Sequence, residues 1–200
     1  GDTAASLRSS AAASIDALAS PRSQTAAPPP PEPPSRTINI VVGTWNLGNK
    51  VPDSDLTQWL QPGADIYAVC CQEQGYHGVA TTRASHWFNL VEAALGAGSA
   101  PLCRVGTASL GNIHVLVLCS QEIRPSVANV EAASEAMGLG GVGANKGVAA
   151  VSLLLGSTPL CFVGGHLAAH EGMQAKRAAN LRDMERAVRL GGGGGAAAHA

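Results

Sequence analysis

The stretch DIYAVCCQE, residues 65–73, decides the class of fold. Residues 66–71 are apolar without interruption and rich in strand-forming types, which predicts a strand buried on both of its faces. The glutamate Glu73 follows at the end of that strand, where the loops of layered α/β folds build their sites. We take Glu73 as a candidate functional residue, the alternative being a solvated loop acid.

A second strong strand precedes it, in TINIVVGTWN at residues 37–46, and its density of β-branched residues predicts a buried strand. Asn46 ends this strand as Glu73 ends the other. Two oxygen ligands at neighbouring strand ends suit Mg²⁺, which uses few protein carboxylates and keeps several waters. The two ends therefore predict a magnesium site formed by Asn46 and Glu73.

Strands dominate the rest of the chain, with helices between them. We expect a short helix at 54–60 capped by Ser54, a helix at 85–98 capped by Ser85 and stopped by glycine, a hairpin at 102–120 that turns at Gly111-Asn112, strands at 146–155 and 160–166, and a polar helix at 171–190 with an apolar stripe at Met173, Leu181, Met184 and Val188. This order indicates an α/β or α+β fold.

The composition, 46% hydrophobic and 14% charged, suits one globular domain. A formal net charge of -1 gives no basic field for nucleic acid, so we expect no nucleic-acid partner, and any anionic ligand must be held locally. Most of the five cysteines lie in apolar runs and are predicted to be reduced core residues, which favours a cytoplasmic location. No apolar stretch approaches the roughly 18 residues of a membrane span, so we expect a soluble protein.

The two ends of the chain are of low complexity. Residues 1–35 are rich in alanine, serine and proline and are predicted to be disordered, and 191–200 form a glycine and alanine tail. The proline run at 28–34 has the composition of an SH3-type or WW-type ligand. The readable domain is therefore expected at 36–190.

Two nucleotide-binding patterns fail in the glycine-rich segment. GLGGVG at 138–143 matches G-x-G-x-x-G, but an alanine-rich, helix-like stretch precedes it and a strand follows, the reverse of a dinucleotide site. Lys146 follows Asn145 and precedes Gly147, with no G-K-[ST] of a phosphate loop. Lys146 is either a flexible point charge close to a phosphate or a solvated turn lysine.

The pair His166 and His170 would share one face of a helix and bind zinc there. The glycines at 164 and 165 instead predict that His166 ends a strand, and no H-E-x-x-H pattern is present, so we expect no zinc site. His166 is then either an ordinary loop histidine or a strand-end histidine that stabilises charge on a reacting phosphate.

Taken together, these pieces resemble the inositol polyphosphate 5-phosphatases, a branch of the Mg²⁺-dependent endonuclease/exonuclease/phosphatase superfamily. The motifs VGTWNLG, SDLTQWL, DIYAVCCQE, NKG and CFVGGHLAAH stand in the order of that family. The resemblance implies a two-sheet β-sandwich flanked by helices, and an enzyme that removes the 5-phosphate of phosphoinositides or inositol polyphosphates at a cytoplasmic or peripheral membrane site. It also implies that Asn46 and Glu73 hold Mg²⁺, that Lys146 and Asn145 contact the substrate phosphate, and that His166 assists at the scissile phosphate.

The chain also departs from the family. Ala144, Val148 and Gly165 stand where the family usually has glycine, glycine and a small polar residue, and the G-D-x-N and S-D-H motifs of the second half of the domain are absent. The resemblance thus implies a sandwich incomplete at its C-terminus and a truncated, inactive part of such an enzyme. Two alternatives stay open: a nuclease or other phosphodiesterase of the superfamily, and a degenerate, non-catalytic interaction module that uses its proline run.

Overall fold

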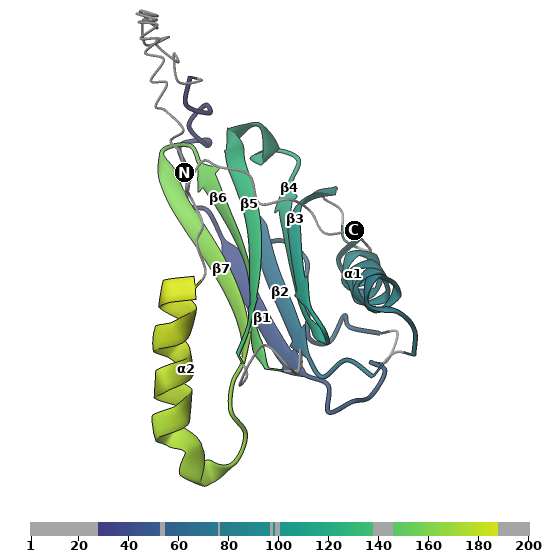
Figure 1. The fold of residues 1–200 in the computed structure, drawn as a ribbon. Coiled ribbons are helices and arrows are strands. Elements are labelled where there is room, and N and C mark those ends of the chain that lie inside the picture. The colour runs from purple at the N-terminus through teal and green to yellow at the C-terminus, as the bar shows by residue number, and fades with distance from the viewer. Residues whose placement is uncertain are drawn as a thin grey trace, which may run out of the picture.

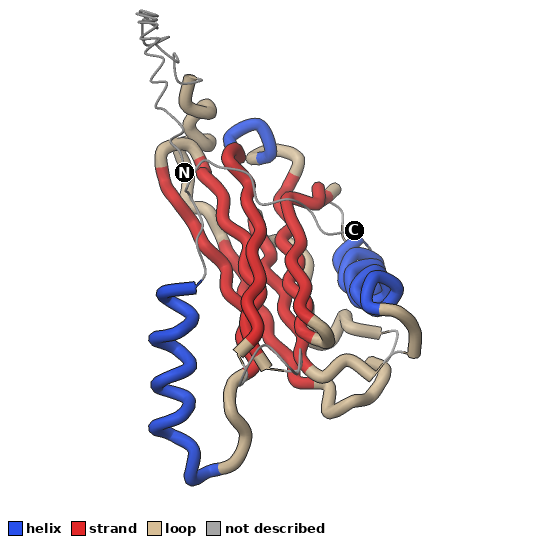
Figure 2. The backbone as a smooth tube through the Cα atoms, in the orientation of Figure 1, coloured by secondary structure: helices blue, strands red, loops and turns tan. Residues whose placement is uncertain are grey.

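The computed structural model describes residues 28–52, 55–75, 77–96, 98, 101–137 and 146–187. Within these residues the strands form two sheets that pack face to face, and a helix lies beside each sheet (Figure 1). This arrangement is the two-sheet sandwich flanked by helices that the sequence resemblance implies. Figure 2 shows that the loops at one end of the sandwich gather where several strands end.

Sheet A has the strand order β1-β2-β4-β3. Its strands are β1 (Ile40–Asn46), β2 (Ile66–Gln72), β3 (Leu102–Leu110) and β4 (Ile113–Ser120). β1 and β2 are parallel and pair Asn46 with Gln72, so both strands end at the same edge and Glu73 follows directly. β3 and β4 form the expected hairpin, with Gly111 at a φ of 55° in the turn, a left-handed conformation that glycine adopts easily.

Sheet B has the order β5-β6-β7, and all of its pairs are antiparallel. Its strands are β5 (Val127–Ala136), β6 (Gly147–Leu155) and β7 (Thr158–His166). A single 3-10 turn, η1 (Arg124–Ser126), connects β4 to β5 and carries the chain from one sheet to the other. Gly147 pairs with His166, so the start of β6 and the end of β7 meet.

Two helices accompany the sheets. α1 (Ala80–Gly96) lies along the outer face of sheet A, and α2 (Gln174–Ala187), preceded by the short η3 (Glu171–Met173), lies beside sheet B (Figure 1). Among the described helices, none combines the length and apolar character needed to cross a membrane.

Strand β2 is the centre of the packing because its side chains alternate between two cores. Tyr67, Val69 and Cys71 point into a core that sheet A forms with α1. Ile66, Ala68 and Cys70 point into a second core between the sheets. Burial of the larger side chains among these, such as Ile66 and Val69, stabilises by about 1.5–3 kcal/mol each, which explains why the strand is apolar on both faces. The prediction of a fully buried strand here is confirmed.

Gly164 allows the two sheets to approach closely near the end of β7. A Cβ atom at this position would lie 2.2 Å from Sγ of Cys70 and 2.6 Å from Cγ2 of Val115. The neighbouring Gly165 faces the other way. A Cβ atom there would lie 3.1 Å from Cε of Met184, so the absence of a side chain leaves room for α2. The glycine pair thus fits β7 between sheet A and α2.

The prediction of a buried strand at 37–46 is wrong for β1. Val42 is 72% exposed and Ile40 is 40% exposed. β1 is an edge strand of the four-stranded sheet, and the three described strands of sheet B do not cover it. Its β-branched residues therefore favour a strand without indicating burial.

Both helix predictions in the first half of the chain need correction: the first helix does not form, and the second begins earlier than expected. Residues 56–60 form only a turn, closed by the Leu60 amide, which donates to the Leu56 carbonyl at 2.8 Å, and the predicted cap Ser54 lies outside the described residues. Helix α1 begins at Ala80 and not at Ser85, and it ends at Gly96, two residues before the expected end but at a glycine, as predicted.

The alanine-rich stretch before residue 138 is also not helical, because it forms β5 and pairs along β6. Pairing with a buried neighbour strand outweighs the helix preference of its alanines. GLGGVG itself lies outside the described residues, but a strand and no helix follows it, so the dinucleotide pattern still fails.

Two further predictions about the core need correction. All five cysteines are free, but only Cys70, Cys71 and Cys119 are buried, and Cys161 is exposed. On α2 the expected apolar stripe is only partly used. Met184 is buried, whereas Met173 and Leu181 are 40% and 50% exposed, and Val188 lies outside the described residues.

A cluster of charged side chains lies where the chain begins sheet A. Arg36 donates to both carboxylate oxygens of Asp65, at 2.5 and 3.1 Å, and also pairs with Glu122 at 3.0 Å. Burial raises the pKa of Asp65, but the bonds from Arg36 and from the Asn39 amide outweigh it and hold the pKa below its usual value. These contacts fix the start of β1 against β2.

Candidate metal and phosphate site

The carboxyl ends of β1 and β2 form the floor of the candidate site. The amide of Leu47 donates to the carbonyl of Gln72, and the amide of Asn49 donates to the carbonyl of Glu73, both at 2.8 Å. These bonds continue the parallel pairing past the strand ends. They hold Asn46 and Glu73 on adjoining strands at one edge, as the sequence predicted.

Glu73 has a left-handed backbone with a φ of 52°. This conformation costs a non-glycine residue on the order of 1 kcal/mol, and it persists only where the surroundings enforce it. Here the flanking bonds enforce it, from Asn49 to Glu73 and from the Gly75 amide to the Lys50 carbonyl at 3.0 Å. The turn leaves the Glu73 side chain 30% exposed at the edge of the sandwich.

His166 meets Glu73 from the opposite sheet. Its Nε2 lies 3.1 Å from Oε1 of Glu73, and its side chain is only 11% exposed. The ammonium of Lys146 contacts the same Nε2 and lies 3.4 Å from Nδ1. Three side chains that are distant in sequence thus gather at one edge: Glu73 from the end of β2, Lys146 from the start of β6 and His166 from the end of β7.

One imidazole nitrogen serves both partners in this cluster. A neutral Nε2 accepts a hydrogen bond from the lysine, whereas a protonated Nε2 donates to the carboxylate. The ring can therefore place a donor or an acceptor at the same point, depending on which neighbour it faces. Such a group is suited to contact an oxygen whose charge changes during a reaction.

Lys146 is held in place through its backbone. The amide of Met137 donates to the carbonyl of Lys146 at 2.9 Å, across the end of the β5–β6 pair. The next residue, Gly147, has a φ of 155°, and a Cβ atom there would lie 2.3 Å from the Glu135 carbonyl oxygen. Only glycine fits this crossing, which fixes where the lysine leaves the sheet.

The predicted site residues can now be placed. Glu73, Lys146 and His166 lie together. Asn46 stands at the adjoining strand end, where its Oδ1 accepts the Gly48 amide at 2.9 Å, and Asn145 lies outside the described residues. In the described part of the chain, no group of three or more His, Cys, Asp or Glu side chains forms a metal cluster. His170 is exposed and directly precedes η3.

Sequence reasoning missed Gln72. Its side chain is 7% exposed, and its Nε2 donates to Oγ1 of Thr44 at 3.1 Å, which ties the ends of β1 and β2 together. The available signal was a polar residue near each candidate ligand: Gln72 one step before Glu73, and Thr44 two steps before Asn46. That signal becomes meaningful only once the strands are known to be parallel and in register.

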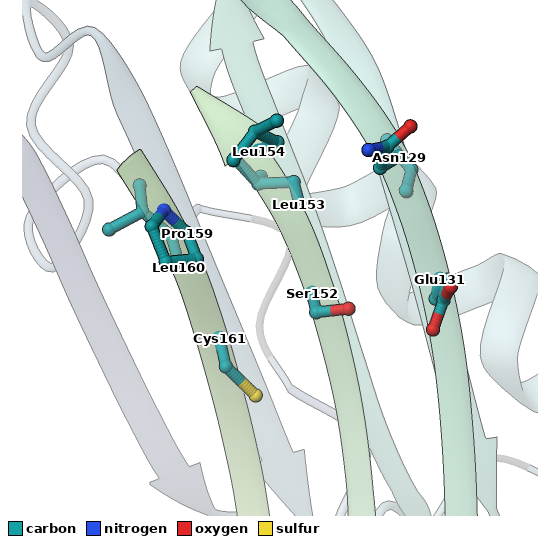
Figure 3. Close-up of a pocket in the computed structure, with 9 residues that line it drawn as sticks. Asn129, Glu131, Ser152, Leu153, Leu154, Pro159, Leu160 and Cys161 are labelled. Carbon is teal, nitrogen blue, oxygen red and sulfur yellow. The ribbon is translucent and has the colours of Figure 1, made fainter. Parts of the chain in front are cut away.

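A groove of about 540 Å³ lies elsewhere, on sheet B (Figure 3). Ser152, Pro159 and Cys161 line it, and they stand far along their strands from Gly147 and His166. The groove therefore does not belong to the Glu73 edge.

Comparison with known proteins agrees with the fold and with the motifs at this edge. The model of Endonuclease/Exonuclease/phosphatase family 2 matches residues 43–199. The chain belongs to this family. The matched range contains every residue of the candidate site.

Curated relatives of this chain carry the names of inositol 5-phosphatases. The chain is 32% identical to phosphatidylinositol 3,4,5-trisphosphate 5-phosphatase 2B of Danio rerio, over 77% of this chain and 13% of that protein. It is 31% identical to type II inositol 1,4,5-trisphosphate 5-phosphatase of Mus musculus, over 74% of this chain and 16% of that protein. It thus spans less than a fifth of the length of either relative.

A solved structure matches the fold of this chain. The inositol polyphosphate 5-phosphatase domain of spsynaptojanin, in complex with inositol (1,4)-bisphosphate and calcium ion, superposes with a TM-score of 0.67 at 28% identity. The match covers 76% of this chain and 47% of that domain. The family 2 chain therefore spans about half of the matched domain.

Proposed function

We propose that the protein hydrolyses the 5-phosphate of phosphoinositides or inositol polyphosphates. The observation that carries this proposal is the meeting of Glu73, His166 and Lys146 at one edge of the sandwich. A carboxylate, an imidazole and an ammonium from three strands form a place where a phosphate can be bound and its charge countered. The similarity to inositol 5-phosphatases supports the choice of substrate.

The residues at this edge fit a divalent cation, and we propose Mg²⁺. Glu73 supplies a carboxylate and Asn46 an amide oxygen, on strands that adjoin at Asn46 and Gln72. Hard cations take oxygen ligands, and Mg²⁺ commonly uses one or two protein groups and fills its shell with water. When bound, the ion would polarise a phosphoryl oxygen.

The remaining side chains act on the phosphate. Lys146 supplies a point charge that Gly147 lets the backbone carry close to the ligand, and Asn145 is assigned beside it on sequence grounds. His166, with one nitrogen between Lys146 and Glu73, donates to a phosphate oxygen as negative charge develops there. Catalysis of phosphoryl transfer consists largely of such positioning and charge stabilisation.

We also propose a cytoplasmic location, with peripheral contact at membranes that carry the lipid substrate. The free cysteines support a reducing compartment. The proline run at 28–34 is proposed as an SH3-type or WW-type ligand. Three of its four leading prolines are exposed, whereas Pro33 lies near Gly156 at the β6–β7 turn.

Phosphate release tests the proposed activity. The protein, expressed from its complete open reading frame, is given inositol phosphates that differ only in the position of one phosphate. We expect release from the 5-position alone, dependent on Mg²⁺. Glu73→Gln keeps the size of the side chain but removes its charge, so kcat should drop on the order of 10²-fold or more.

The control is Glu185→Gln on the exposed face of α2, which should leave the rate unchanged. Normal activity and an unchanged Mg²⁺ requirement in Glu73→Gln would refute the metal site. Hydrolysis of a phosphodiester to a monoester and an alcohol, with no phosphate released from the 5-position, would favour the nuclease alternative.

A further inference from the structure

Two cysteines face each other across the hairpin of sheet A. Cys103, near the start of β3, is paired directly with Cys119, near the end of β4, and the pairing is in register over Leu102–Arg104. Residues opposite each other in an antiparallel pair have Cα atoms about 4.5–5.5 Å apart. A disulfide needs a Cα separation of about 4.4–6.8 Å, so the backbone already holds the two residues within the required range.

Both side chains lie on the same face of the sheet. Cys119 is fully buried in the core between the sheets, and the partly exposed Cys103 packs against that core. Both thiols are free in the structure. Because directly opposite side chains already point to one side, a bond between the sulfur atoms needs rotation of the side chains and only a small approach of the strands.

The other three cysteines have no cysteine opposite them in the described strands. Their pairs are Cys70 with Thr44 and Val115, Cys71 with Trp45 and His114, and Cys161 with Ser152. Cys70 and Cys71 adjoin in sequence, but they point into different cores on opposite faces of β2. The strand register therefore singles out one pair.

The position of the pair in the sheet gives access to it. Among the described strands, β3 is an edge strand of sheet A, and its pairing with β4 is interrupted by a bulge between Arg104 and Gly106. The cysteine pair lies between this bulge and the start of β3. The end of an edge strand opens at low cost in free energy, so Cys103 is the sulfur that a small oxidant reaches.

The electrostatic surroundings set the order in which the two thiols react. Burial raises the pKa of the Cys119 thiol to about 11, the neighbouring Cys103 sulfur adds to the rise, and the charge of Arg124 opposes it. Arg124 is held in η1, where its Nη1 donates to the Val127 carbonyl at 3.2 Å. The thiolate is the attacking form, so the exposed Cys103 reacts with an oxidant first and Cys119 reacts second.

We propose that Cys103 and Cys119 form a reversible redox site, in which a small disulfide such as oxidised glutathione converts the two thiols into a cross-strand disulfide. The Cys103 sulfur attacks one sulfur of the oxidant, whose S–S bond breaks and releases one glutathione. The Cys119 sulfur then attacks the Cys103 sulfur and releases the second glutathione. The two cysteine protons end on the two glutathione thiols, so the protein loses two electrons and the oxidant gains two.

The oxidised pair would join the edge strand β3 to β4 at the end of sheet A that lies away from Glu73. Cys119 pairs with Ile66 at the start of β2, whereas Glu73 follows the other end of that strand. The redox site is therefore independent of the proposed phosphatase activity. A dithiol reductant restores both thiols by the reverse exchange.

Peptide mapping tests the site. The native protein, freed of reductant, is incubated with oxidised glutathione, unfolded, alkylated at its remaining thiols and digested with trypsin. Cleavage after Arg104 places the two cysteines on separate peptides. We expect a linked pair of these peptides, lighter than the two thiol peptides together by about 2 Da, the mass of two hydrogens. Dithiothreitol should release both peptides.

Three comparisons serve as controls. In Cys103→Ser the linked pair should vanish and Cys119 should remain open to alkylation. Cys161→Ser, which removes the exposed thiol of sheet B, should leave the linked pair unchanged. Oxidation in urea should lower the share of the Cys103–Cys119 link several-fold, because the register no longer holds the two residues together.

Three outcomes would overturn the proposal. Glutathione retained on Cys103, with Cys119 still open to alkylation, would show that the two sulfurs do not meet. An unmodified Cys103 after long incubation would show that the oxidant does not reach the pair. A link no more abundant after native oxidation than after oxidation in urea would show that the fold does not direct it.

Discussion

Glu73 and His166 belong to different sheets, yet their side chains lie 3.1 Å apart, between Oε1 and Nε2. Residues of facing sheets are ordinarily separated by the roughly 10 Å thickness of a sandwich core. Here the contact forms at the end of the core, because Gly164 lets β7 approach Cys70 of β2 just before both strands end. The site therefore depends on the absence of a side chain at Gly164 as well as on its own polar residues.

Replacing Gly164 by alanine should separate the sheets. The new Cβ would lie 2.2 Å from Sγ of Cys70, and overpacking of a core costs about 1–3 kcal/mol. We expect this loss in urea unfolding, together with a lower rate. Gly172→Ala, where nothing lies within 4 Å, is the matched control. The combination with Cys70→Ala should restore part of the stability, and equal stability of Gly164→Ala and wild type would contradict the close approach.

Lys146→Ala should raise KM several-fold and change kcat little, because the ammonium acts on the bound phosphate. The backbone bond from Met137 to Lys146 does not depend on the side chain, so the strand should keep its place. Steady-state kinetics and Mg²⁺ titration check this, with Lys176→Ala on the exposed surface of α2 as control. A loss of Mg²⁺ affinity at unchanged KM would show that the lysine is placed wrongly.

The buried His114 should make stability depend on pH. Burial, assisted by the charge of Arg83, lowers its pKa from 6.5 to about 4. The unfolded chain then binds a proton at a higher pH than the folded chain does, so this contribution is complete above pH 6.5 and is lost as the pH falls toward 4. The loss amounts to about 3 kcal/mol at most. Thermal melting between these pH values should show a smaller decline for His114→Gln, and parallel declines would refute it.

The thiols should differ sharply in reactivity. Cys161 is exposed in the groove of sheet B, whereas Cys70 is buried and burial raises its pKa to about 11. Because the thiolate is the reactive form, a water-soluble thiol reagent should modify Cys161 first. Mass spectrometry of partly labelled protein checks the order. Rapid labelling of Cys70 in the native state would mean that the sandwich opens.

The exposed edge at β1 should promote self-association. β1 is paired on one side only within the described residues, and Val42 is 72% exposed on it. Unpaired strand edges with apolar side chains are sites of edge-to-edge pairing. Size-exclusion chromatography over a range of concentrations should show larger species for wild type than for Val42→Lys. A wild-type chain that elutes as a monomer throughout would contradict the expectation.

Much of this fold was readable from local patterns. β2 was recognisable because residues 66–71 of a strand inside two cores are all apolar. The hairpin was recognisable because Gly111-Asn112 separates two strand-forming runs. The position of Asn46 and Glu73 at neighbouring strand ends followed from the same strands. These features are encoded over a few consecutive residues.

Features set by distant partners were not readable. The stretch at 127–136 reads as helix-like from its alanines and becomes a strand only because β6 offers an edge to pair with. The exposure of β1 depends on how many strands face it. The meeting of Glu73 with His166 depends on a glycine 91 positions along the chain from Glu73, in the other sheet. Residues of this kind have no local signature.

The alternation of β2 between two cores also bears on how the molecule unfolds. The odd-numbered residues of β2 pack against α1, and its even-numbered residues pack against sheet B. Both hydrophobic cores therefore include this strand. We expect that neither core unfolds while the other stays intact, because displacement of β2 removes buried side chains from both. Hydrogen exchange at the amides of β2 should then proceed only through opening of the whole sandwich, so this strand would be the last to exchange and would report the global stability directly.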